Sequence, residues 1–119
     1  MGRIGVQKQY RLAKRKDFGK VYKLGRSAAN RQFVVYSLAN PQTETMRVGV
    51  SVSKKLGGAV VRNRLRRRVK EIVRLNAHRI VPGYDLVVIV RKPVLDQSYA
   101  EMENSLKHVF KRAGLWNKK

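Results

Sequence analysis

The chain has 119 residues, enough for one domain with a substantial core, because 43% of its residues are hydrophobic. Lys and Arg total 28 against 7 Asp and Glu, so the formal net charge is +21, which favours a polyanionic partner such as nucleic acid. The absence of cysteine excludes disulfides and thiolate chemistry. No apolar run approaches the roughly 20 residues that a membrane-spanning helix needs.

The first predicted element is a short helix over residues 18–24 that stops at Gly25. Phe18, Val21 and Tyr22 share one side of this helix. That spacing is typical of core residues, but the two aromatic rings also leave open a surface on which bases stack.

Two strands are predicted next. Residues 32–39 and 46–53 are rich in β-branched side chains, and a polar loop over residues 40–44 separates them. Because the connection is short, we expect these two strands to pair antiparallel with each other.

The second of these strands has a face of small residues. Its valines point one way, and Gly49, Ser51 and Ser53 point the other. Such a face either meets water or leaves room for another object, and the residues alone do not decide between these alternatives. If Val34 and Tyr36 border it, the face becomes a shallow aromatic-floored groove that suits unpaired bases.

Positive charge is densest between residues 54 and 74, which hold nine of the 28 Lys and Arg and a single acid. Beyond Gly57 and Gly58 the pattern is helical, over about residues 59–76. One side is apolar: Val61, Leu65, Val69 and Ile72. The other side is polar and cationic: Asn63, Arg66, Arg67, Lys70 and Arg74.

This charge pattern is more than that of a solvated surface helix. Like charges at i, i+4 repel each other and destabilise a helix unless something neutralises them. Arginine also presents a planar fork of donors that matches phosphate oxygens. The helix therefore predicts a core-facing side and a side that binds a polyanion.

A turn at residues 82–83 precedes residues 84–91, whose almost continuously apolar sequence predicts a strand covered on both faces. Ser98 and Glu101 have the spacing of a capping box for a last, structural helix that ends near Ala113, with Trp116 packed just beyond it. The order of elements predicts a compact single-domain α+β or α/β sandwich, with helices packed on a small mixed sheet.

The side chains predict little chemistry of their own. His78 and His108 are not in a metal-ligand pattern, and the seven acids form no recognisable catalytic pair. Asp85 and Asp96 bracket the predicted strand and the loop after it, which leaves a magnesium site near them open. The glycine pair at residues 57–58 lacks the Lys and Ser/Thr of a phosphate-binding P-loop.

Residues 54–57 and 59–67 resemble the signature of the bacterial ribonuclease P protein subunit, with the Arg-Asn-Arg core at residues 62–64. Three other segments are also similar to parts of that family. Residues 17–25 resemble its first helix, residues 30–36 its first long strand, and residues 47–55 the strand before the signature. The resemblance covers nearly the whole chain. One departure is Tyr22, where phenylalanine is more usual; stacking survives that change.

The resemblance implies a fold and a function. The fold would be an α+β sandwich with an unusual left-handed βαβ crossover around the signature helix, whereas general statistics favour the right-handed form. The function would be that of a cytoplasmic protein subunit of a ribonucleoprotein endonuclease that removes the 5′ leader of precursor tRNA. The partner RNA would carry the active site and hold Mg²⁺, so no catalytic residue, membrane or small-molecule substrate is expected for the protein.

The resemblance also assigns residues within a single RNA-binding domain over residues 1–119. The positions that would bind the catalytic RNA are Lys54, Lys55, Arg62, Asn63, Arg64, Arg66, Arg67 and Lys70. The positions that would bind the single-stranded leader are Phe18, Tyr22, Val34, Tyr36 and Ser51. We expect a flexible basic N-terminus over about residues 1–10 and a loose tail over about residues 117–119.

Two other functions compete with this hypothesis. A ribosomal or general nucleic-acid-binding module would have the same charge, but an aromatic groove beside a small-residue face favours a leader-binding subunit. A nuclease acting alone is disfavoured because no acid–base set is recognisable.

Overall fold

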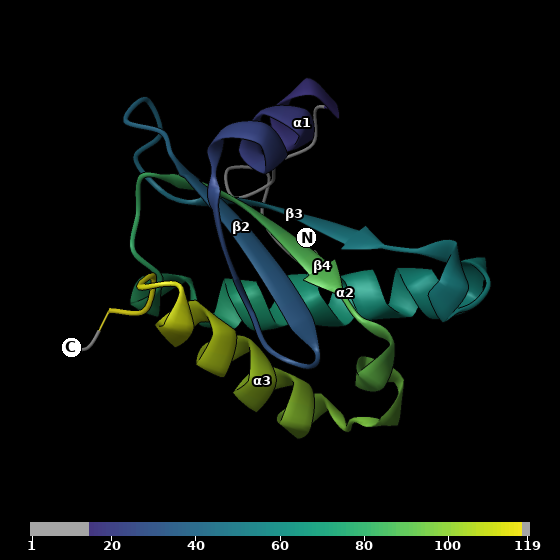
Figure 1. The fold of residues 1–119 in the computed structure, drawn as a ribbon. Coiled ribbons are helices and arrows are strands. Elements are labelled where there is room, and N and C mark those ends of the chain that lie inside the picture. Colours follow the sequence, from purple (N-terminus) through teal and green to yellow (C-terminus); the bar gives the residue numbers. More distant parts are fainter. Residues whose placement is uncertain (1–14, 118–119) are drawn as a thin grey trace, which may run out of the picture.

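A computed structural model describes residues 15–117 of the chain (Figure 1). Its helices and strands are α1 (Arg15–Leu24), β1 (Arg26–Ala29), β2 (Phe33–Ala39), β3 (Arg47–Val52), α2 (Ala59–Leu75), β4 (Tyr84–Val90) and α3 (Tyr99–Arg112). The N-terminal segment predicted to be flexible lies outside the described residues, as do residues 118–119. Asn117 is held, because its backbone N–H donates to the Arg79 carbonyl at 2.6 Å. No helix within residues 15–117 is long and apolar enough to cross a membrane.

The four strands lie in the order β1-β2-β4-β3. β4 runs antiparallel to β2 and parallel to β3, so the prediction that β2 and β3 pair with each other is wrong. The apolar run of β4 explains the difference, because a strand buried on both faces belongs in the middle of a sheet. β1 was not predicted, because its sequence, Arg-Ser-Ala-Ala, has no β-branched or aromatic residue.

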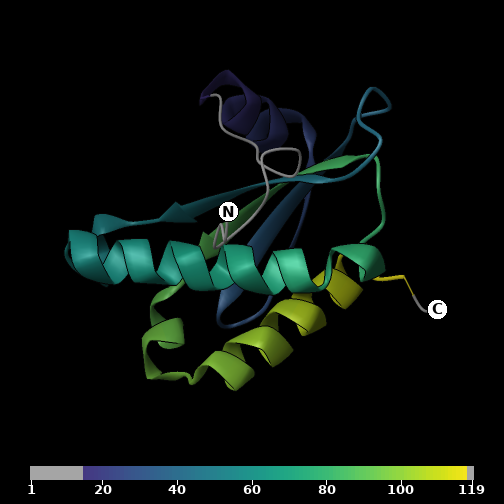
Figure 2. The same ribbon diagram turned by 180° about the vertical axis from the view of Figure 1, so that it is seen from behind.

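The sheet separates two layers of helices. α2 and α3 cover one face and α1 lies on the other (Figures 1 and 2). The main core lies between the sheet and the α2–α3 layer, and the predicted apolar stripe of α2 faces it. Leu65, Val69 and Ile72 are buried there, with Val61 packed at the margin. The α+β sandwich predicted from the order of elements is confirmed.

β3 and β4 are parallel neighbours joined through α2, which makes the β3–α2–β4 unit a crossover connection. In Figure 1, α2 lies below the sheet and β4 lies nearer the viewer than β3, and Figure 2 shows the same arrangement from behind. With the strands directed to the right in Figure 1, this crossover is left-handed, as the resemblance implied.

The end of the chain closes the main core. Ser98 Oγ accepts the Glu101 N–H at 3.2 Å, and the Ser98 N–H donates to Glu101 Oε1 at 2.8 Å, so the predicted capping box is confirmed. Trp116 packs against the core, with the Arg79 guanidinium 5.6 Å from its ring centroid. The last helix is thus fixed at both ends against the sheet and α2.

Candidate nucleic-acid interface

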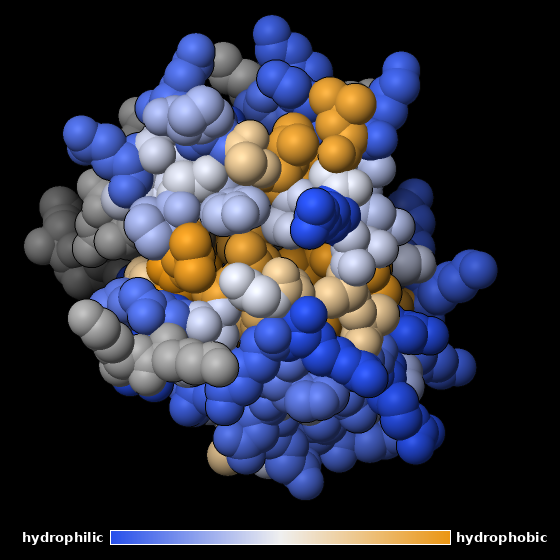
Figure 3. All heavy atoms as spheres, turned by 60° about the vertical axis from the view of Figure 1, so that its left-hand side comes forward, coloured by the Kyte–Doolittle hydropathy of each residue, from blue (hydrophilic) through white to orange (hydrophobic). Residues whose placement is uncertain are grey.

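Charge alone does not locate an interface on this molecule. Figure 3 shows one side of the protein, where strongly hydrophilic side chains lie above and below a band of apolar ones. Exposed cationic side chains lie on α1 and α3 as well as on α2, for example Lys23 and Lys111. The arrangement of particular residues on α1, α2 and the sheet has to distinguish one surface from another.

The solvent-facing side of α2 holds most of the residues expected to bind the catalytic RNA. Asn63, Arg64 and Arg67 are exposed, and Arg66 and Lys70 are half-buried beside them. Arg66 donates to Asn63 Oδ1 at 3.0 Å, one turn away, so the asparagine orients a guanidinium on the helix surface. The predicted cationic side of the helix is therefore a continuous surface.

Arg74 differs from the other arginines of α2. Its Nε and Nη2 donate to the two carboxylate oxygens of Glu71 at 3.1 and 2.7 Å. The hydrogen bonds to Glu71 raise the pKa of Arg74 above its ordinary value. Glu71 thus neutralises the C-terminal end of the helix and leaves the cationic surface concentrated over the first three turns.

Arg62 and the two lysines lie where α2 begins. The Arg62 Nε is buried and has no hydrogen-bond partner among the described residues, an arrangement that an incoming acceptor would relieve. Lys54 and Lys55 are exposed in a short 3₁₀ turn (Lys54–Leu56) between β3 and α2. Gly57, at φ 146°, lets the chain turn from there into the helix. These lysines therefore border both α2 and the end of β3.

The face of the sheet beneath α1 carries the residues expected to bind the leader. The strand register places Tyr36, Val87 and Gly49 in one row across β2, β4 and β3. A Cβ on Gly49 would lie 2.2 Å from Cζ of Phe18, so the Phe18 ring rests directly on this glycine. The small-residue face does leave room for another group, and at Gly49 that group is the Phe18 side chain of α1.

Tyr22 and Tyr36 form the second aromatic contact of α1. Their ring centroids are 5.1 Å apart at an interplanar angle of 88°, an edge-to-face pair. Tyr22 is 39% exposed, whereas Tyr36 is half-buried against the small cluster formed by Val21 and Val87. Of the two rings, Tyr22 is the more accessible to a ligand, and Tyr36 supports it from the sheet.

A second row across the sheet lies next to these rings. Val34, Ile89 and Ser51 are neighbours on β2, β4 and β3, and each is half-exposed. Among the described helices only α1 lies on this face, and its aromatic residues contact the adjacent row (Figure 1). Ile89 was missed, because the apolar run of β4 gave no sign that this position is half-exposed.

The conceivable magnesium site at Asp85 and Asp96 does not form. Asp85 is buried, and its carboxylate accepts hydrogen bonds from Nε and Nη2 of Arg47, each at 2.8 Å. It also accepts a hydrogen bond from the side-chain amide of Asn40 at 3.1 Å. Asp96 lies in a 3₁₀ turn beyond the other end of β4. Within residues 15–117 no three His, Asp or Glu side chains gather as metal ligands. Asp85 instead fixes β3 and the β2–β3 loop to β4.

The contact between Phe18 and Gly49 predicts the behaviour of Gly49→Ala. The new methyl group would displace the ring and remove much of the burial of a half-buried phenylalanine, so unfolding should become easier by about 1 kcal/mol. In a Phe18→Ala background the same substitution should not lower the free energy of unfolding, since alanine suits a strand better than glycine. Urea unfolding of the four proteins of this double-mutant cycle measures the coupling.

Gly19→Ala is the matched control for that cycle. Nothing lies within 4 Å of a Cβ at Gly19, which is inside α1. Alanine should therefore leave stability unchanged or raise it by up to about 1 kcal/mol. Equal costs of Gly49→Ala with and without the Phe18 ring would show that the ring does not lie on the glycine.

Comparison with known proteins identifies the family of this chain. Residues 6–114 match the family model described as Ribonuclease P. The ribonuclease P protein component of Exiguobacterium sibiricum is 47% identical over 113 residues, covering 95% of this chain and 97% of that protein.

Solved structures agree as well. The RNase P protein of Staphylococcus aureus matches with a TM-score of 0.85 and 44% identity, covering 91% of this chain and 98% of that chain. The RNase P protein of Thermotoga maritima, solved in complex with 1-(4-fluorophenyl)-2-thiourea, matches with a TM-score of 0.80 and 37% identity. That match covers 86% of this chain and 98% of that chain. The family model, the relatives and the shared fold show that this chain belongs to the ribonuclease P protein family.

Proposed function

We propose that this chain is the protein subunit of a ribonucleoprotein that removes the 5′ leader of precursor tRNA in the cytoplasm. The observation that carries the proposal is the juxtaposition of two different surfaces in a member of this family. One is the arginine-rich side of α2, and the other is the aromatic side of α1 with the adjoining sheet face. The 3₁₀ turn that contains Lys54 and Lys55 connects them.

The α2 surface suits the backbone of a folded RNA. Its arginine guanidiniums are planar donors that pair with phosphate oxygens, and RNA phosphates would relieve the repulsion between neighbouring cations. The residues that we assign to the catalytic RNA are Lys54, Lys55, Arg62, Asn63, Arg64, Arg66, Arg67 and Lys70.

The α1 side suits a single strand. Phe18, Tyr22 and Tyr36 present ring edges and faces next to the half-exposed row that contains Val34 and Ser51. Aromatic rings stack on any base, so this surface would recognise an unpaired leader with little regard to its sequence. Precursor tRNA would then be distinguished from mature tRNA by the leader itself.

The protein would assist catalysis by binding and positioning. Within residues 15–117 no three His, Asp or Glu side chains come together as metal ligands. We place the active site and Mg²⁺ on the RNA. The α2 surface would hold the catalytic RNA, and the α1 side would keep the leader beside it, which raises the local concentration of the substrate.

The direct test is cleavage of a precursor tRNA at limiting Mg²⁺ by the catalytic RNA, with and without this protein. We expect leader removal to depend on the RNA and to be strongly stimulated by the protein, while the protein alone releases nothing. A protein that leaves RNA-catalysed cleavage unchanged would instead act as a general nucleic-acid-binding module. Cleavage by the protein alone would indicate an independent nuclease.

A double variant makes that test specific to α2. Replacing Arg66 and Arg67 with alanine should weaken binding to the catalytic RNA and flatten its salt dependence, because each lost phosphate contact lowers the slope of log K against log salt by about 0.7–0.9. The control is a second double variant, in which Lys111 and Arg112 at the exposed end of α3 are replaced with alanine, so that the same amount of positive charge is removed. If both pairs flatten the slope equally, total charge and not the α2 surface governs binding.

A further inference from the structure

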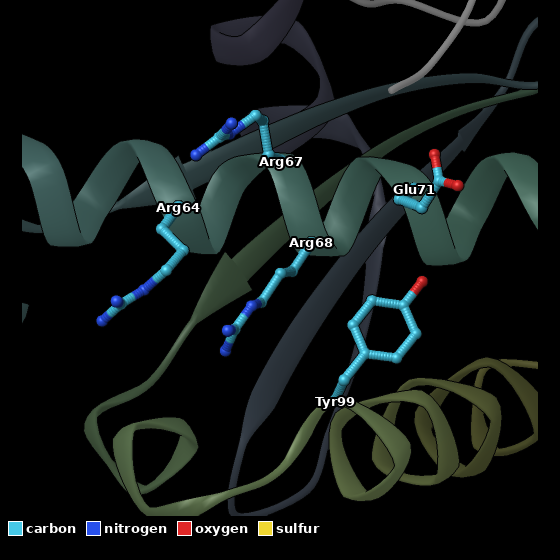
Figure 4. A pocket seen from close by; sticks show the side chains of 5 residues that line it. All are labelled: Arg64, Arg67, Arg68, Glu71 and Tyr99. Atoms are coloured by element: carbon cyan, nitrogen blue, oxygen red, sulfur yellow. The ribbon is translucent and has the colours of Figure 1, made fainter. Parts of the chain in front are cut away.

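A cationic hollow lies between α2 and the first turn of α3, apart from the aromatic side of α1. It is lined by Arg64, Arg67, Arg68, Glu71 and Tyr99 (Figure 4). Its volume of about 380 Å³ is comparable to that of sites that hold small organic groups. Nothing in the sequence indicated a role for Arg68, and the pattern of α3 predicted a purely structural helix.

The arginines of α2 divide around this hollow. Arg64 and Arg68 are one turn apart and both leave α2 on the side where Tyr99 lies, whereas Arg67 points to the other side of the helix (Figure 4). Neither Arg64 nor Arg68 donates a hydrogen bond to any residue within the described part of the chain. Two guanidiniums with unused donors therefore line the hollow on one side of the Tyr99 ring, and Arg68 is the nearer of the two.

Tyr99 is held in place as the first residue of α3. The Ser98–Glu101 capping box fixes the backbone on either side of it, and its half-buried ring packs at the margin of the main core. The hydroxyl end points toward Glu71 (Figure 4). Burial raises the pKa of the Tyr99 phenol, and Glu71 and Glu103 raise it further, so the side chain is neutral at pH 7. A neutral, pre-positioned ring neither repels phosphate nor loses much freedom when a ligand stacks on it.

An aromatic ring with two guanidiniums on one side of it suits a nucleotide better than a phosphate alone. A base stacks on tyrosine, and arginine supplies donors to the phosphate or to the edge of the base. Bases within a duplex are already stacked on one another, so only an unpaired nucleotide can enter. We propose that Tyr99, Arg64 and Arg68 form a subsite for one unpaired nucleotide of the catalytic RNA, an inference that rests on the function proposed above.

Two substitutions at Tyr99 separate stacking from packing. Tyr99→Phe keeps the ring, and Tyr99→Leu keeps apolar bulk without an aromatic face. We expect Tyr99→Phe to bind the catalytic RNA within about 2-fold of wild type and Tyr99→Leu to bind roughly 5- to 150-fold more weakly. The salt slope should stay unchanged for both, since no phosphate contact is lost. Arg68→Gln should instead lower the slope by about 0.7–0.9.

Chemical modification of the RNA bases provides a readout that does not depend on affinity. At protein concentrations that saturate the RNA, wild type and Tyr99→Phe should protect one unpaired base that Tyr99→Leu leaves reactive. Arg68→Gln should expose the same base, so the subsite can still be tested if Tyr99→Leu folds poorly in urea melts.

The outcomes separate this inference from the function on which it rests. If wild type binds the RNA and Tyr99→Leu matches Tyr99→Phe in affinity and protection, the subsite does not exist and the proposed function stands. A base protected equally by all variants contradicts the subsite in the same way. Failure of the wild-type protein to bind the catalytic RNA would overturn both proposals.

Discussion

Leu65→Ala is expected to lower the free energy of unfolding by about 2–5 kcal/mol, the usual cost of truncating a buried leucine. Leu65 is only 3% exposed and lies on the side of α2 that packs against the sheet. Truncation would remove apolar contacts and leave a cavity beneath the middle of the helix. Because the interior is closely packed, neighbouring side chains would fill that space only in part. Urea unfolding followed by circular dichroism measures the change.

Arg67→Ala is the matched control on the same helix. Arg67 is exposed, two residues from Leu65, and points away from the α3 side of α2 (Figure 4). Its replacement should change stability by no more than about 0.5 kcal/mol, while it weakens binding to the catalytic RNA. The reverse order of the two effects on stability would mean that the helix presents its other side to the core.

The sequence was most informative where structure depends on neighbours along the chain. The apolar stripe of α2 repeats at the helical period, so its buried side could be predicted from spacing alone. The capping box at Ser98 and Glu101 is equally local, and both predictions are confirmed. The alternation along β3 likewise identified the glycine and serine face, although not what would cover it.

Strand pairing was predicted wrongly because it depends on distant segments. β2 and β3 are separated by a short loop, and local reasoning pairs them. β4, more than thirty residues beyond β3, takes the place between them because its apolar run is best buried at the centre of the sheet. The contact between Phe18 and Gly49 is of the same long-range kind. So is the position of Tyr99 beside α2, which no spacing in the sequence could have indicated.

The assignment of α2 and α1 to different RNAs stays a prediction, and the sheet beneath α1 offers the sharpest test of it. Tyr36→Ala should weaken binding of the assembled ribonucleoprotein to leader-bearing precursor tRNA by about 1–3 kcal/mol, the value of one base stacked on an aromatic ring. Binding of mature tRNA, which has no leader, should scarcely change. Comparing the two affinities cancels any shared effect on assembly with the catalytic RNA.

Packing has to be separated from stacking, because Tyr36 also supports Tyr22 and the cluster around Val21 and Val87. Tyr36→Phe preserves the ring and its edge-to-face contact, so it should bind precursor tRNA nearly as well as wild type. Tyr22→Ala removes a ring that is 39% exposed and should lose leader discrimination with a smaller loss of stability than Tyr36→Ala. If Tyr22→Ala and Tyr36→Ala weaken both tRNAs equally, or act only by unfolding the protein, these rings belong to the core and the leader binds elsewhere.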